Sequence, residues 1–173
     1  MRNRVPRFEI RAAVMDRCSP AELIREAQRI GLQSRCCIVC LDADRIAGVR
    51  HAESAVRHGL RAWEAGTAIA DSLEMEVLLY AGGTRQTSIG STFGVRSDTT
   101  NLYLCFIPPS EEAITEMGYC VRHTEEDGEN LTEEKVRRLA ELFGITPAEC
   151  EAVGRGRFQD LVIERVALLD VYR

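Results

Sequence analysis

Cys36-Cys37-Ile38-Val39-Cys40-Leu41 is an unbroken apolar run of strand length, and it predicts a β-strand that is buried on both faces. A second run with the same character is Leu102–Ile107, which stops at Pro108-Pro109. Residues 7–15 alternate apolar and polar side chains and predict another strand, and residues 118–123 predict a short one. Long segments separate these runs, so the predicted sheet joins distant parts of the chain.

The segments between the strands have the spacing and the capping signals of helices. A helix from Ser19 to Gly31 begins with the capping box Ser-Pro-Ala-Glu, and Thr146 begins a second box with proline. Asp71-Ser72-Leu73-Glu74 predicts a third box, at the start of a helix that ends at Gly82-Gly83. Further helices are predicted over residues 49–65, 84–93, 111–117, 132–143 and 157–172. We predict an α+β fold: a single domain, residues 1–173, with a small mixed sheet and helices packed beside it.

Charge is unevenly distributed along the chain. Residues 1–65 contain 12 arginines and 8 acids, whereas residues 66–173 contain 10 basic residues and 19 acids, and the net charge is −5. The acidic total argues against a general nucleic-acid binder, but an early basic face remains compatible with phosphate binding. The acidic stretch at residues 125–129 is expected to be a solvated turn. No apolar run reaches the roughly 20 residues that span a bilayer, and we expect a cytoplasmic protein.

The cysteines and histidines do not form a recognisable catalytic or metal-binding set. Cys37 and Cys40 have the CxxC spacing, and with Cys36 they raise a zinc or redox hypothesis. No second pair follows, and the apolar residues between them favour packing in the core. His51 and His58 share one helix face, and solvent exposure is the simplest interpretation of His51. We predict no catalytic residue, no cofactor and no metal ion.

The stretch Gly82-Gly83-Thr84-Arg85-Gln86-Thr87-Ser88-Ile89-Gly90 resembles a phosphate-binding loop in composition. It lacks the Lys-Ser/Thr pair of a Walker A loop, and it follows a helix instead of a strand. It can still offer free backbone N–H groups, one guanidinium and one amide to a ligand. One alternative function is therefore a small phosphate- or nucleotide-binding enzyme that uses this loop, and the other interpretation is a helix end followed by a helix start.

Three segments together resemble the kinase-binding small subunit of KEOPS, the complex that makes threonylcarbamoyladenosine (t6A) in tRNA. They are Leu41–Ile46 with the helix that follows, Ser72–Gln86, and Val162–Asp170. Ser72–Gln86 is the most specific, because an acidic apolar helix there ends in small-Gly-x-Arg-Gln. The resemblance covers the chain from about residue 36 to its end.

The resemblance implies a non-enzymatic subunit with two partners. One is the atypical kinase/ATPase subunit of KEOPS, and the other is tRNA, including its single-stranded 3′ CCA end. Unpaired ends are bound through arginine–phosphate contacts and hydrogen bonds to exposed bases. In this sequence the resemblance makes Arg85 and Gln86 candidates for the tRNA end, with backbone contacts from Arg50, Arg57 and Arg61. The final helix, apolar on two sides, is the candidate for kinase docking through Leu161, Arg165 and Leu168.

Overall fold

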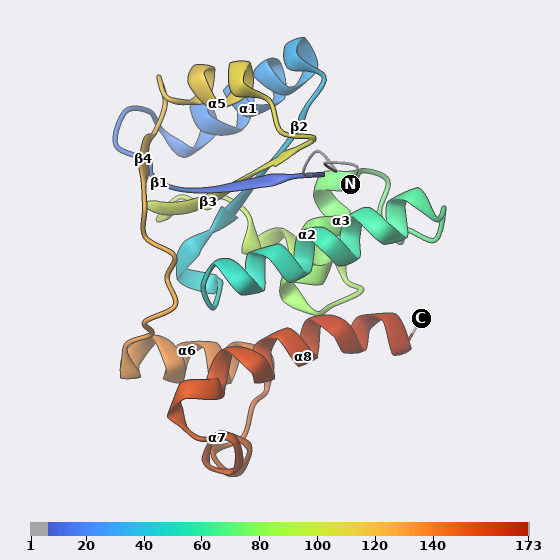
Figure 1. Ribbon diagram of the computed structural model, residues 1–173, viewed down its shortest axis with the longest axis vertical. Coiled ribbons are helices and arrows are strands. Elements are labelled where there is room, and N and C mark those ends of the chain that lie inside the picture. The colour runs from blue at the N-terminus through green and yellow to red at the C-terminus, as the bar shows by residue number, and fades with distance from the viewer. Residues whose placement is uncertain (1–6, 173) are drawn as a thin grey trace, which may run out of the picture.

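The computed structural model describes residues 7–172, and within this part of the chain four strands form one sheet between layers of helices (Figure 1). The strands are β1 (Glu9–Val14), β2 (Cys37–Asp42), β3 (Asn101–Ile107) and β4 (Arg122–Thr124). The α-helices are α1 (Pro20–Ser34), α2 (Val49–Glu64), α3 (Leu73–Gly82), α4 (Thr87–Gly90), α5 (Glu111–Met117), α6 (Glu133–Phe143), α7 (Pro147–Val153) and α8 (Phe158–Val171). Short 3-10 turns are η1 (Ala43–Arg45), η2 (Ser91–Phe93) and η3 (Arg155–Arg157).

The strand order is β2-β3-β1-β4, and every neighbouring pair is antiparallel. The predicted α+β class is confirmed, but the prediction of a mixed sheet is wrong. β1 and β2 run in the same direction, as a strand–helix–strand unit requires, yet β3 lies between them and separates the parallel strands. This is the split β-α-β arrangement of ferredoxin-like sheets.

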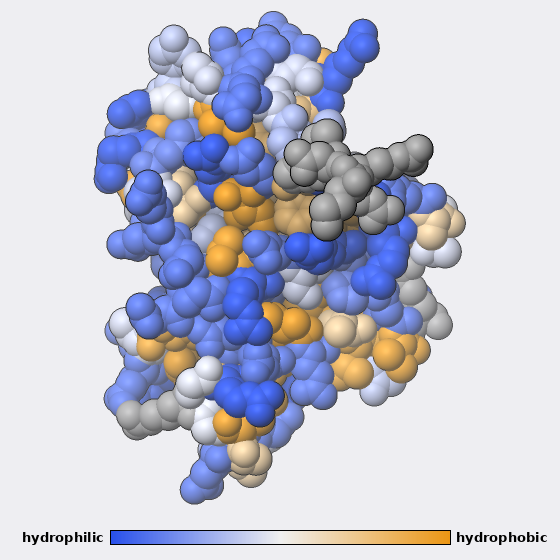
Figure 2. Space-filling view, in the orientation of Figure 1, coloured by the Kyte–Doolittle hydropathy of each residue, from blue (hydrophilic) through white to orange (hydrophobic). Residues whose placement is uncertain are grey.

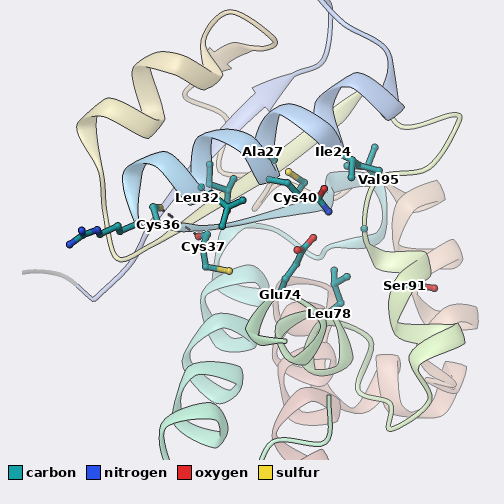
Figure 3. Close-up of a pocket in the computed structure, with 15 residues that line it drawn as sticks. Ile24, Ala27, Leu32, Cys36, Cys37, Cys40, Glu74, Leu78, Ser91 and Val95 are labelled. Atoms are coloured by element: carbon teal, nitrogen blue, oxygen red, sulfur yellow. Dashed lines mark hydrogen bonds between the residues drawn. The ribbon is translucent and has the colours of Figure 1, made fainter. Parts of the chain in front are cut away.

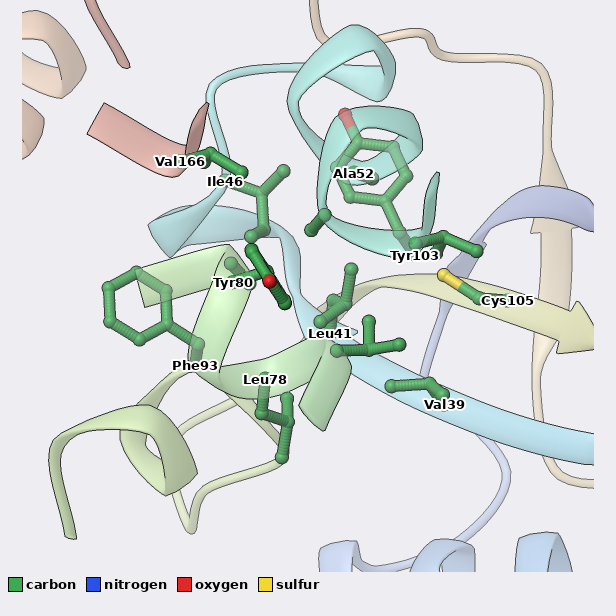
Figure 4. Packing of buried hydrophobic residues seen from close by; sticks show 14 of the residues in the cluster. Val39, Leu41, Ile46, Ala52, Leu78, Tyr80, Phe93, Tyr103, Cys105 and Val166 are labelled. Carbon is green, nitrogen blue, oxygen red and sulfur yellow. The ribbon is translucent and has the colours of Figure 1, made fainter. Parts of the chain in front are cut away.

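Both faces of the sheet are covered, which explains the apolar run of β2. Successive side chains of a strand point to opposite faces. Ile38 and Cys40 pack with α1 and α5 in one hydrophobic cluster. Val39 and Leu41 pack with α2 and α3 in another, where Figure 4 shows them beside Leu78. A strand with apolar layers on both faces has no solvent-facing side, so its sequence does not alternate between apolar and polar residues.

A third layer is formed by α6, α7 and α8, which lie below α2 and α3 in Figure 1. Val166 and Leu169 of α8 belong to the cluster that contains α2 and α3. Leu161 and Val162, earlier in the same helix, belong to a separate cluster with Leu139 of α6. The two-sided apolar pattern of this helix therefore reflects contact with two clusters.

The acidic loop at residues 125–130 exposes Glu125, Glu126 and Asp127 to solvent, as expected, and it also makes hydrogen bonds to neighbouring elements. The Asp127 carbonyl accepts hydrogen bonds from the Val49 N–H at 2.7 Å and from the Tyr103 hydroxyl at 3.0 Å. The Glu129 carboxylate accepts from the Arg50 N–H at 3.1 Å, and its carbonyl accepts from Gln159 Nε2 at 2.6 Å. The loop thus joins the start of α2 to β3 and α8.

Two predicted helix boundaries are wrong for local reasons. α1 continues past Gly31 to Ser34 and ends at Arg35, which adopts φ of 50°. A Cβ on Gly31 would lie 2.6 Å from the Cys36 carbonyl oxygen, so glycine here permits close approach of the chain entering β2. α3 is capped by Ser72, which accepts from the Met75 N–H, so the predicted capping box from Asp71 to Glu74 is not formed.

His51 is fully buried, which corrects the interpretation of an exposed side chain. The Ala47 N–H donates to His51 Nδ1 at 2.9 Å, so Nε2 carries the proton and donates to the Ala81 carbonyl at 2.9 Å. Burial lowers the pKa of His51 to about 4. The neutral ring therefore joins the start of α2 to the end of α3.

Replacing His51 with leucine should remove a pH-dependent part of the stability. Because the pKa is about 4 in the folded chain and about 6.5 in the unfolded chain, acid favours unfolding between these values. The wild type should lose about 3 kcal/mol of unfolding free energy from this group between pH 7 and 4. At pH 7 the variant should be less stable by about 2–4 kcal/mol, because two buried backbone groups lose their partners.

Urea unfolding of both proteins from pH 7 to 4 measures this effect. Carboxylates titrate in both proteins and largely cancel in the difference. The difference in unfolding free energy between the wild type and the variant should decrease by about 3 kcal/mol as the pH falls from 7 to 4. A constant gap would show that His51 has an ordinary pKa.

Candidate functional site

Three arginines lie on one exposed side of α2. Arg50, Arg57 and Arg61 are spaced by seven and four residues, which places them on the same helix face. They border a groove of about 230 Å³ between α2 and α8. Its lining is Arg50, Glu53, Ser54, Arg57, His58, Arg61 and Ile163. The structure therefore brings together the three arginines predicted to contact the RNA backbone.

Each of these arginines has a neighbour that orients it. Arg50 Nη2 donates to Asp160 Oδ1 at 2.9 Å, and Arg61 Nη2 lies 3.1 Å from His58 Nδ1. The Arg57 guanidinium lies 5.3 Å from the centre of the Phe8 ring. An aromatic face attracts a cation but does not neutralise it. Arg57 thus keeps a positive charge that is available to an anion in the groove.

The carboxylate of Asp170 holds the end of α8 against α2 and α3. It lies 2.7 Å from His58 Nδ1 and accepts a hydrogen bond from the Tyr80 hydroxyl. The His58 and Tyr80 rings stack with their centroids 5.4 Å apart. Asp170 of α8 therefore contacts His58 of α2 and Tyr80 of α3. These contacts fix α8 beside the arginine face of α2.

Arg85 and Gln86 lie on the exposed turn between α3 and α4. Gly83 ends α3 with φ of 57°, a left-handed conformation that favours glycine. Arg85 Nη1 donates to the backbone carbonyl of Tyr172, directly after α8. The turn is thus attached to the end of α8, with both predicted side chains at the surface.

The predicted RNA-binding residues are arranged along α8 instead of around one pocket. Near the start of α8, Asp160 contacts Arg50, and beyond its last turn Tyr172 contacts Arg85. The 14 residues of α8 correspond to about 20 Å of helix. The arginine groove and the Arg85 turn therefore form two separate contact points for an extended ligand.

Close packing explains the glycines of the Gly82–Gly90 stretch. A Cβ on Gly82 would lie 2.7 Å from the Phe93 ring, and one on Gly90 would lie 2.9 Å from Leu79. A Cβ on Gly83 would lie 3.1 Å from the Arg165 carbonyl oxygen of α8. The glycine pattern that suggested a phosphate loop thus has a structural origin, in contacts with η2, α3 and α8.

Comparison with known families gives one match, which covers nearly all of the structure just described. The model of the kinase-binding protein CGI-121 matches residues 9–170. The chain belongs to the CGI-121 family of kinase-binding proteins. The match begins at β1 and reaches Asp170, so it includes residues 9–35, where the resemblance read from the sequence was weaker. No curated protein matches the chain.

In this CGI-121 protein the residues predicted to dock the kinase differ in accessibility. Leu161 is 7% exposed and packs in the cluster with α6. Arg165 is half-buried and donates to Glu149 Oε1 at 2.7 Å. The Thr146 backbone N–H and Arg165 together lower the pKa of Glu149 to about 2. Leu168 is also half-buried, so Arg165 and Leu168 keep surface for a partner and Leu161 mainly supports the helix.

Tyr172 is a residue of the candidate site that the sequence did not reveal. Its side chain is 69% exposed and Val171 is 70% exposed, and Figure 2 shows hydrophobic surface where α8 ends. The Tyr172 carbonyl binds Arg85, so an exposed aromatic residue lies on the segment beside the Arg85–Gln86 turn. The only signal available from the sequence was an apolar helix that ends in Val-Tyr.

The cysteines of β2 are packed in the protein and protonated. Burial raises the pKa of Cys37 to about 12 and raises that of Cys40 further. Among residues 7–172, no group of three or more histidine, cysteine or acidic side chains is placed to hold a metal ion. A thiol with a raised pKa is a poor nucleophile and a poor metal ligand. In the same part of the chain, no helix combines the length and the apolar character needed to cross a membrane.

Gly83 and Gly144 allow the contact between the Arg85 turn and α8 to be measured. Both glycines end a helix in the left-handed conformation, but only Gly83 has a neighbour within 4 Å of an added Cβ. Gly144→Ala should cost about 1–2 kcal/mol for the backbone alone. Gly83→Ala should cost at least about 1 kcal/mol more, because the methyl group meets α8. Urea unfolding of the two variants gives the comparison, and equal losses would mean that the turn does not press on α8.

Proposed function

We propose that this CGI-121 protein is a non-catalytic subunit of the KEOPS complex, required for t6A modification of tRNA in the cytoplasm. In this role it binds the atypical kinase/ATPase subunit and grips tRNA, including the 3′ CCA end. The observation that supports the proposal is that Arg50, Arg57 and Arg61 border a groove with α8 and that Arg85 is bonded to the residue after it, in a chain of a kinase-binding family. α8 is thus the element shared by the two proposed contacts with tRNA.

The non-catalytic role is supported by the state of the candidate reactive groups. His51 is buried and bonded on both ring nitrogens to the backbone. His58 is engaged with Asp170, which also accepts from Tyr80. The thiols of β2 have raised pKa values. The buried His51 ring and these thiols stabilise the fold and are not poised as a general base or as nucleophiles.

The tRNA role is supported by the chemistry of the two contact points. The α2–α8 groove offers guanidinium groups for phosphates, with that of Arg57 positioned over the Phe8 ring. The turn offers the guanidinium of Arg85, the exposed amide of Gln86 and the nearby ring of Tyr172. A charged group for phosphate, an amide for a base edge and an aromatic face for stacking are what an unpaired end requires. Glu53 borders the groove as well, so we expect modest affinity with strong dependence on salt.

Substitution of the groove arginines should weaken tRNA binding without changing its preference for the 3′ end. The double variant Arg57→Gln/Arg61→Gln should lower the slope of log affinity against log salt by roughly 1.5, since each phosphate contact to a single strand contributes about 0.7. The loss should be the same for intact tRNA and for tRNA without its CCA end. Arg25→Gln, an exposed arginine on α1, is the matched control and should leave both tRNAs unaffected.

Variants of the Arg85–Gln86 turn should change the preference for the 3′ CCA end, which the groove variants leave unchanged. Arg85→Ala should reduce the difference in affinity between intact and CCA-less tRNA, and should lower the salt slope by about 0.7. Gln86→Ala should reduce the same difference and leave the salt slope unchanged, because an amide carries no charge. Filter binding over a range of salt separates these effects. Equal affinity of the wild type for the two tRNAs would refute the proposed grip on the 3′ end.

Charge placed on the exposed part of α8 should disrupt kinase binding. Leu168→Glu should weaken affinity for the purified kinase subunit about 30-fold, the loss expected when a central apolar contact of about 2 kcal/mol is removed. Leu142→Glu is the control, since Leu142 is a partly exposed leucine at 37% on the neighbouring helix α6. Titration calorimetry with the kinase subunit measures both. Unchanged affinity of Leu168→Glu, with wild-type unfolding, would place the kinase on another face.

A further inference from the structure

The two edges of the sheet differ in how they are protected. β4, at one edge, has three residues and carries the polar sequence Arg-His-Thr. β2, at the other edge, has six residues and is apolar over Cys37–Leu41. Proteins usually protect an edge strand with charge, proline, a bulge or short length, because its outward N–H and C=O groups can pair with another chain. β4 has this protection, and the apolar sequence of β2 does not.

A groove of about 760 Å³ runs over β2 at the outer edge of the sheet (Figure 3). Ile38 and Cys40, which point to the α1 face of the sheet, line it together with Cys37, which packs toward α2 and α3. Side chains from both faces of a strand meet in one groove only where that groove follows the strand's edge. The edge of β2 therefore forms the floor of the groove.

The walls of the groove are apolar and reach the molecular surface. α1 contributes Ile24 and Leu32, which are 41% and 83% exposed. On the other side Leu78 of α3 and Val95 complete the lining, and Figure 3 shows Leu78 directed toward β2. Exposed leucine and isoleucine beside a groove are typical of a protein-binding surface. An edge strand between two apolar walls is the geometry that accepts an added strand.

Glu74 supplies the one acidic side chain among the residues that line this groove. Figure 3 shows its carboxylate directed from α3 toward β2. Burial raises the pKa of Glu74, and within residues 7–172 its carboxylate has no hydrogen-bond donor or cation as a partner. A desolvated carboxylate without a partner gains from an incoming cation. Arg35, at the end of α1, also lines the groove, so a basic group is favoured beside Glu74 and not along the whole groove.

We propose that this groove binds an extended segment of a partner protein, which adds a strand beside β2 and pairs a lysine or arginine with Glu74. Main-chain hydrogen bonds to the edge of β2 supply the register, and alternate apolar side chains of the segment contact the walls. The groove shares no lining residue with the α2–α8 groove. The β2 groove is thus separate from the proposed tRNA contacts. If the β2 groove bound no peptide, the proposal on tRNA binding would be unaffected.

Selection from a display library of random 12-residue peptides against the full chain tests this proposal. The wild type should enrich peptides with apolar residues at every second position and one lysine or arginine. Glu74→Lys should enrich an acidic residue at the same position, and Glu74→Gln should show no charge preference there. The best peptide should lose at least about tenfold in affinity for Glu74→Gln, as expected when a hydrogen bond to a charged group is removed.

Strand addition has a second signature in the same peptide. N-methylation of its backbone should abolish binding at alternate positions only, and β2 amides should exchange hydrogen more slowly in the complex. Three results would overturn the proposal: no enrichment over an unrelated protein, apolar residues at helical spacing, or a charge preference that Glu74→Lys does not reverse. Dimerisation of the chain through β2, with no competition from the peptide, would also overturn it, because the occupant would then be a second copy. Urea unfolding like that of the wild type would confirm that Glu74→Lys is folded.

Discussion

The seating of α8 on α2 and α3 is the constraint on which the candidate site depends. Val166 and Leu169 bury the helix in the central cluster, while Asp170 contacts both His58 and Tyr80. The apolar contacts supply most of the free energy, and the directional contacts fix the position of the helix along its axis. Without this seating the groove between α2 and α8 would not form, and the Arg85 turn would lose its contact with Tyr172.

Local features of the fold were accessible from the sequence, and long-range features were not. The apolar runs identified β2 and β3, and the capping boxes at Ser19 and Thr146 formed as predicted, because both signals act within a few residues. The antiparallel order depends on β3 inserting between β1 and β2, which no local pattern encodes. The burial of His51 has the same origin, since its partner Ala81 lies 30 residues away along the chain.

The candidate site shows the same difference between local features, which the sequence predicts, and long-range contacts, which it does not. The spacing of Arg50, Arg57 and Arg61 places them on one helix face in any context, so their proximity was predictable. That α8 would form the opposite wall was not, because Asp160 and Asp170 lie more than 100 residues from the residues they contact on α2. Leu161 shows the converse difficulty: an apolar residue on a two-sided helix serves equally well in a core or at an interface, and only the packing of α6 decided between them.

The two surfaces differ in the physics by which they would bind. The α2–α8 face offers exposed, partly paired charges, and such a surface gains affinity through counterion release and loses it with salt. The β2 groove offers apolar walls, a strand edge and one desolvated acid, so its binding depends on burial and backbone pairing, which salt affects little. The two grooves share no lining residue. This member of a kinase-binding family therefore has two separate surfaces of different chemistry, the charged face between α2 and α8 and the apolar edge of the sheet at β2.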